Sequence, residues 1–127
     1  MKLLVDTHAF LWFMAGDARL SRPARRALED DEGEWWVSAA SVWELSIKSS
    51  LKRIVLPMSA TEYVAEKVKS GLRILSIDWT HAAAVESLPF YHRDPFDRLL
   101  VAQAQTERLA IVTSDPVFRP YGVRVVW

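Results

Sequence analysis

The sequence predicts an α/β fold: a mainly parallel sheet of about five strands with helices on both faces, in three α/β/α layers. Short apolar runs of the kind found in buried strands alternate with longer stretches that have helical periodicity and helix-start residues. The 127 residues show no internal repeat, low-complexity segment or interdomain linker, so we expect a single domain spanning residues 1–127. In such a sheet, right-handed crossovers bring the carboxyl ends of the strands to one edge.

The first half of the chain supplies two strands and three helices. A continuous apolar run opens the chain, and Ser followed by Arg-Pro later marks a helix start with a serine N-cap and a first-turn proline. The acidic run at residues 30–34 is a solvated turn. The predicted elements are a strand at Leu3–Val5, helices at His8–Ala15 and from Ser21, a strand at Trp35–Val37, and a helix from Ser38 to Ser49.

The second half continues the alternation. Ser59 or Thr61 caps a helix that runs to Lys69 and is closed by Gly71. The remaining predicted elements are a strand at Leu72–Ile77, a helix from Thr80 to Leu88, a helix from Asp94 to about Leu109, and strands at Ala110–Thr113 and Val123–Trp127.

Composition and charge narrow the class of protein. The absence of cysteine excludes disulfides, thiolate chemistry and zinc sites of the cysteine type. With 16 basic and 16 acidic residues, binding to nucleic acid cannot depend on bulk positive charge and requires local basic patches or a bound cation. Nothing in the N-terminal stretch is typical of a signal peptide, and no apolar run approaches membrane-spanning length. We therefore expect a cytoplasmic protein with no membrane partner.

Four carboxylates fall where the predicted topology gathers side chains. Asp6 and Asp115 follow the first and fourth strands, in LLVDT and AIVTSD. Glu44 lies about two turns into the helix after the second strand, and Asp97 lies in the first turn of a later helix. Crowded carboxylates repel one another, and a hard divalent cation relieves that repulsion. Oxygen ligands without cysteine favour Mg²⁺ or Mn²⁺, which can activate water and offset the charge of a phosphodiester.

Three of these acids also have simpler interpretations. Ser41 and Glu44 fit a capping box, although Ser38 is an equally good cap. Asp94 fits an N-cap, with Asp97 as a first-turn charge that favours the helix dipole. Asp115 fits a plain turn.

Four stretches, in order, resemble the PIN-domain proteins of the VapC toxin–antitoxin type: LLVDTHAFLWF, VSAASVWELSIKSSL, LPFYHRDPFDRLLVAQA and LAIVTSDPVF. The resemblance implies a Mg²⁺-dependent endoribonuclease toxin, usually dimeric and held inactive by a cognate antitoxin. The local departure is KSSLKRIVLP, which lacks an expected glycine in a loop. The family's acidic site falls on Asp6, Glu44, Asp97 and Asp115, Asp94 matches a further acid, and Thr7 and Thr113 match positions that support the site by hydrogen bonding.

Most of the basic and aromatic residues near these motifs have more than one interpretation. Arg93 and Arg98 either bind an RNA phosphate or pair with the neighbouring acids. His8 and His92 are proton donors, RNA contacts or structural residues, whereas His81 is expected at the surface. The apolar surplus around Trp12 and Trp43 suggests a dimer surface or an antitoxin groove.

Two other functions remain open. A phosphatase with Asp6 as its nucleophile would also begin with a strand followed by Asp, although residue 8 is His where such an enzyme needs a second Asp. A non-catalytic module would use the acidic cleft only to dock a basic segment.

Overall fold

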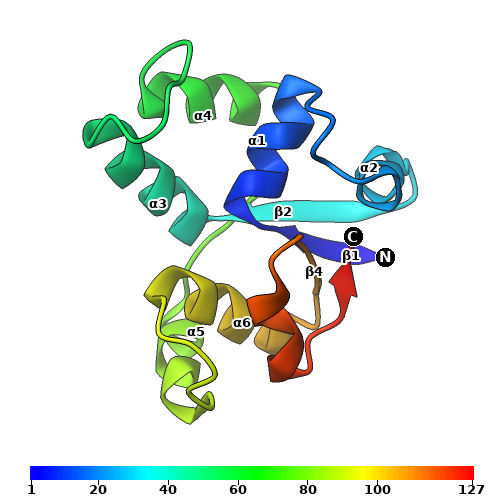
Figure 1. The fold of residues 1–127 in the computed structure, drawn as a ribbon, viewed down its shortest axis with the longest axis vertical. Coiled ribbons are helices and arrows are strands. Elements are labelled where there is room, and N and C mark those ends of the chain that lie inside the picture. The colour runs from blue at the N-terminus through cyan, green and yellow to red at the C-terminus, as the bar shows by residue number, and fades with distance from the viewer.

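The computed structural model describes residues 1–127 and contains one five-stranded sheet in which every pairing is parallel. The strand order is β3-β2-β1-β4-β5, so the first strand lies at the centre (Figure 1). This confirms the predicted fold class. The strands are β1 (Lys2–Val5), β2 (Glu34–Ser38), β3 (Ile74–Leu75), β4 (Ala110–Val112) and β5 (Val125–Val126).

Helices cover both faces of the sheet. Figure 1 shows α1, α3 and α4 on one side and α5 and α6 on the other. None of the helices is both long and apolar enough to cross a membrane. The helices are α1 (Thr7–Ala15), α2 (Arg22–Glu29), α3 (Ala39–Ser50), α4 (Ala60–Lys69), α5 (Trp79–Ala84) and α6 (Pro95–Glu107), with 3₁₀ helices η1 (Val85–Ser87) and η2 (Pro116–Tyr121).

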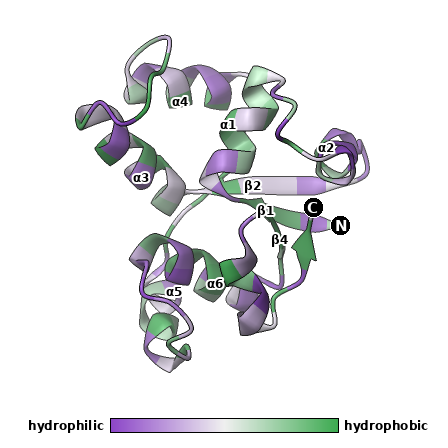
Figure 2. Ribbon diagram, viewed as in Figure 1, coloured by the Kyte–Doolittle hydropathy of each residue, from purple (hydrophilic) through white to green (hydrophobic).

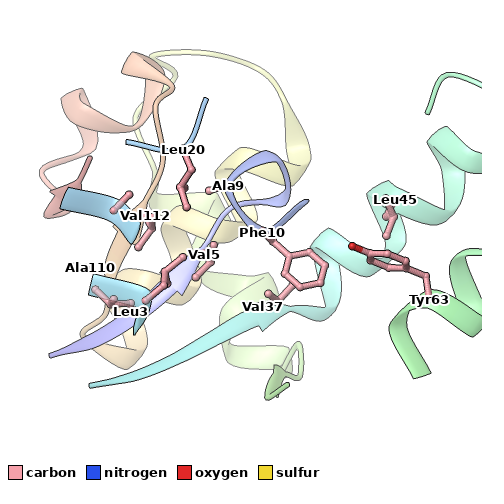
Figure 3. Packing of buried hydrophobic residues seen from close by; sticks show 12 residues of the cluster. Leu3, Val5, Ala9, Phe10, Leu20, Val37, Leu45, Tyr63, Ala110 and Val112 are labelled. Carbon is pink, nitrogen blue, oxygen red and sulfur yellow. The ribbon is translucent and has the colours of Figure 1, made fainter. Parts of the chain in front are cut away.

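The central strand separates two hydrophobic cores. Leu3 and Val5 point to one face, where they pack in a cluster with Phe10 of α1 (Figure 3). Leu4 points to the opposite face and belongs to a second cluster with Phe118. Because both faces are covered, β1 has the continuous apolar run typical of parallel strands. In Figure 2 most of β1 is hydrophobic, whereas α2 is largely hydrophilic.

The serine caps explain where several helices begin. Ser21 and Ser59 accept hydrogen bonds from backbone N–H groups three residues on and cap α2 and α4, as predicted. Ser38 caps α3 through the N–H of Ala40, two residues on.

The predicted edge strands and one helix needed correction. The strand predicted at 72–77 is confined to Ile74–Leu75, and the one predicted at 123–127 is confined to Val125–Val126. Each is an edge strand with a neighbour on one side only, so fewer backbone hydrogen bonds define its length. The helix predicted from Thr80 is capped instead by Asp78, and α5 gives way to η1 after Ala84.

His81 is buried and not at the surface as predicted. It is 2% exposed; its Nδ1 accepts from the N–H of Asp78, and its Nε2 lies 2.7 Å from Glu107. The contact with Glu107 joins α5 to α6.

Candidate active site

A pocket of about 460 Å³ lies at the carboxyl edge of the sheet, where the sequence places the acids. Its walls come from the segment after β1, from α3, from the start of α6 and from the segment after β4. Every predicted carboxylate lines this one pocket: Asp6, Glu44, Asp94, Asp97 and Asp115.

Asp6 is the N-cap of α1, which explains why an acid, rather than a turn residue, follows the first strand. Its Oδ1 accepts a hydrogen bond of 2.8 Å from the backbone N–H of Ala9. Its Oδ2 accepts from the hydroxyl of Thr113, which lies just after β4. Burial raises the pKa of Asp6, while the hydrogen bonds from Thr113 and Ala9 oppose that rise. One oxygen is therefore held by the first turn of α1 and the other by the residue that follows β4.

Thr113 also positions the second strand-end acid. Its Oγ1 accepts a 3.0 Å hydrogen bond from the N–H of Asp115. Asp115 in turn accepts from the N–H of Val117 at 3.0 Å and caps η2. The turn interpretation of Asp115 is thus correct as local structure, and the same turn directs the residue into the pocket.

Glu44 is held from α1 and from its own helix. Its Oε1 accepts a 2.7 Å hydrogen bond from the hydroxyl of Thr7, and its Oε2 lies 3.1 Å from Nζ of Lys48. The capping-box interpretation is wrong, because Ser38 caps α3 and Ser41 makes no hydrogen bond through its hydroxyl. The sequence analysis did not pair Lys48 with Glu44, although a spacing of four residues is typical of a helical ion pair.

Among the acids of the pocket, Asp97 has the most strongly raised pKa. Asp94 is the N-cap of α6 and accepts from the backbone N–H groups of Phe96 and Asp97 at 2.8 and 3.2 Å. Asp97 follows in the first turn, with its carboxyl facing the pocket. Burial raises the pKa of Asp97 to about 7, and negative charge on four neighbours adds to the effect: Asp94, Asp115, Glu44 and Asp6.

The donor chemistry of the pocket fits a hard divalent cation. All five acidic residues offer carboxylate oxygens, and mutual repulsion helps to raise the pKa of Asp97, as expected for a site that a cation neutralises. In their present rotamers no three of these groups are close enough to enclose an ion. Glu44 turns to Thr7 and Lys48, and Asp6 to Thr113, so ion binding requires side chains to leave or share these partners.

Arg98 has neither of the roles predicted for it. The residue is 4% exposed, and its guanidinium donates to the carbonyls of Val85, Leu88 and Pro89 and to the hydroxyl of Tyr121. It binds no acid, and its burial keeps it from a phosphate.

The other basic candidates lie at or near the surface. Arg93 is exposed, so an RNA contact there stays a prediction. His8 is exposed on the pocket wall. His92 lies between Tyr121 and Asp97, with Nε2 3.3 Å from Oδ2 of Asp97, a link that the sequence did not reveal.

The fold and the pocket define a class: a parallel α/β domain with an acidic pocket at the carboxyl edge of its sheet. The model of the PIN domain family matches residues 3–123 of the chain. The chain therefore belongs to the PIN-domain family, and the resemblance seen in its motifs is confirmed.

Within that family, the chain is similar to a ribonuclease of the VapC type. Ribonuclease VapC22 of Mycobacterium tuberculosis (strain ATCC 25618 / H37Rv) is 31% identical to it over 120 residues, covering 94% of this chain and 91% of that protein. A chain in the crystal structure of VapBC2 from Rickettsia felis bound to a DNA fragment from their promoter has a TM-score of 0.72 at 14% identity, with 98% and 97% of the two chains covered. A chain in the crystal structure of FitAcB from Neisseria gonorrhoeae has a TM-score of 0.66 at 20% identity, with 97% and 95% covered. These two structures share the fold of the chain.

Proposed function

We propose that this protein is a Mg²⁺-dependent endoribonuclease and the toxin of a toxin–antitoxin pair. The observation that carries the proposal is the meeting of Asp6, Glu44, Asp97 and Asp115 in one pocket. There burial and the charges of the neighbouring acids raise the pKa of Asp97 to about 7. The ribonuclease relative supports the reaction, and the FitAcB and VapBC2 structures, the second of them solved with promoter DNA, support the toxin–antitoxin setting.

The chemistry assigned to the pocket is hydrolysis of an RNA phosphodiester. Asp6, Glu44, Asp97 and Asp115 would hold Mg²⁺, or Mn²⁺ in its place. When bound, such an ion activates water for attack and offsets the negative charge of the phosphate.

The residues around the acids keep them at the pocket before an ion binds. Thr113 fixes Asp6, while Thr7 and Lys48 fix Glu44. At Asp97 a cation competes with a proton, because the pKa of this carboxyl is raised to about 7. We therefore expect the ion to bind more weakly as the pH falls below 7.

The partners assigned to the protein are RNA and a cognate antitoxin, in the cytoplasm. A groove of about 580 Å³ shares His8, Trp12 and Lys48 with the acidic pocket and continues along α1 toward Tyr63. We assign the antitoxin to this groove because a segment bound there would reach the acids. The exposed Trp43, which packs edge-to-face on Phe96 beside the pocket, is the corresponding candidate for the surface of a homodimer.

Purified protein and a defined RNA test the proposal. Cleavage should require Mg²⁺ or Mn²⁺, stop with EDTA, and be lost in Asp6→Asn. The matched control is Asp31→Asn, which removes the same charge from an exposed turn before β2. Cleavage that survives Asp6→Asn or EDTA would contradict the proposal.

Other readouts separate the two alternative functions. A phosphatase with Asp6 as nucleophile would yield a trapped aspartyl-phosphate and leave RNA intact. A binding module would retain any effect on growth in Asp6→Asn and would bind its basic partner in EDTA.

A further inference from the structure

A chain of polar contacts connects a buried cation to the acidic pocket. Nη1 of Arg98 lies 3.2 Å from the hydroxyl oxygen of Tyr121. The same oxygen lies 2.9 Å from Nδ1 of His92, whose Nε2 is 3.3 Å from Oδ2 of Asp97. Arg98 and Tyr121 are 4% and 7% exposed, so the contact between these two residues is shielded from water.

The donors and acceptors fix the direction of each bond. A guanidinium can only donate, so the oxygen of Tyr121 accepts from Arg98. The hydroxyl hydrogen of Tyr121 then needs an acceptor, and Nδ1 of His92 is the only other hydrogen-bond partner of this group. Since Nδ1 accepts, a neutral His92 carries its hydrogen on Nε2, the atom that faces Asp97.

Nε2 of His92 has no hydrogen-bond partner although it is buried, because its contact with Asp97 is close but not aligned. A buried N–H without a partner costs about 1–3 kcal/mol, so a small rotation that completes the bond is favourable. We infer that His92 is a positioning residue: it donates Nε2–H to Asp97 and holds the ionised carboxylate toward the pocket. The importance of this contact for cleavage depends on the proposed function, whereas the contact itself does not.

Two amide substitutions distinguish the roles of the two ring nitrogens of His92. Gln places its amide nitrogen near the position of Nε2 and can still donate to Asp97, whereas Asn reaches only as far as Nδ1. We expect His92→Asn to lower kcat about 10–100-fold, the range typical for loss of an outer partner of a metal ligand, and His92→Gln to stay within about fivefold of the wild type. KM should change little in both. If His92 only anchors Tyr121, Asn should perform better than Gln, and that order would overturn the inference.

Binding of Mn²⁺ provides a readout without RNA. The rise in melting temperature with Mn²⁺ should require about 10–100-fold more ion in His92→Asn than in the wild type, but not in His92→Gln. Equal dependence on Mn²⁺ in the two variants would overturn the inference.

The tautomer of His92 can be measured on the wild-type chain, which avoids variants that fail to fold. At about pH 8.5, where an ordinary imidazole is neutral, ¹⁵N NMR should find the hydrogen on Nε2. The Nδ1 resonance should then move in Tyr121→Phe, which lacks the hydroxyl donor. A hydrogen on Nδ1 in the wild type would overturn the inference even if the protein cleaves RNA. Failure to cleave RNA, with the expected tautomer and Mn²⁺ dependence, would refute the proposed function alone.

Discussion

Asp97→Asn should stabilise the folded protein in the absence of a divalent cation. Asp97 is partly buried among acids, and its pKa is raised from 3.8 to about 7, so its ionised form is unfavourable in the folded state. The folded chain therefore binds more protons than the unfolded chain between about pH 4 and 7, and this carboxyl lowers stability as the pH rises through that interval. An asparagine has the same shape and no charge to accommodate.

The rise in the pKa of Asp97 from 3.8 to about 7 corresponds to a loss of about 4 kcal/mol in the free energy of unfolding when the carboxyl is fully ionised. The side chain is 24% exposed, and screening by solvent reduces this figure to about 1–2 kcal/mol. Loss of a favourable first-turn charge on α6 opposes the gain by only about 0.3–1 kcal/mol. The net gain at pH 7.5 is up to about 1.7 kcal/mol, which should raise the melting temperature by up to about 6 °C and should shrink to less than half at pH 5.

The measurement is urea and thermal unfolding of wild type and variant in EDTA at both pH values. Asp31→Asn, which changes the net charge equally at an exposed position, should show little effect at either pH. Saturating Mg²⁺ should stabilise the wild type more than Asp97→Asn, because the variant loses a ligand. A gain of equal size at pH 5 and 7.5, or a loss of stability at pH 7.5, would refute the reasoning from crowded carboxylates.

Three further variants test single contacts. Ser41→Ala removes a buried hydroxyl without a hydrogen-bond partner and should stabilise by about 0.5–1 kcal/mol in urea unfolding; a loss above about 1 kcal/mol would reveal a partner for that hydroxyl. Arg98→Ala should lower the free energy of unfolding by about 3 kcal/mol or more, because four acceptors lose a charged donor. A small change in stability together with weaker RNA binding would instead support a phosphate contact. Thr113→Val should lower kcat about 10–100-fold by releasing Asp6, with the fold intact by circular dichroism; unchanged kcat would mean that Asp6 needs no such support.

Sequence patterns predicted the sheet and the meeting of the acids because both depend on order along the chain. An apolar strand such as Leu3–Val5 has no alternative to burial, and parallel crossovers then bring Asp6 and Asp115 to one edge. Edge strands were harder to bound, since pairing on one side alone decides how far Ile74–Leu75 extends.

Buried polar partners were beyond the reach of sequence patterns. His81 is buried because Glu107, in another helix, provides its partner, and Arg98 because the η1 segment offers carbonyls. A charged residue beside an acidic motif gives no local sign of either environment. The capping role of Asp94 was predictable, because Asp-Pro at a helix start is a local signal.

The most direct test of the central claim is a crystal structure with Mn²⁺, with the ion located by its anomalous scattering. We predict a peak in the acidic pocket within ligand distance of oxygens from Asp6 and Asp97, with Glu44 and Asp115 turned toward it directly or through water, and no such peak in Asp6→Asn. Full occupancy of Mn²⁺ at another place, or none in the pocket at concentrations that support RNA cleavage, would contradict a carboxylate-held ion as the basis of the activity.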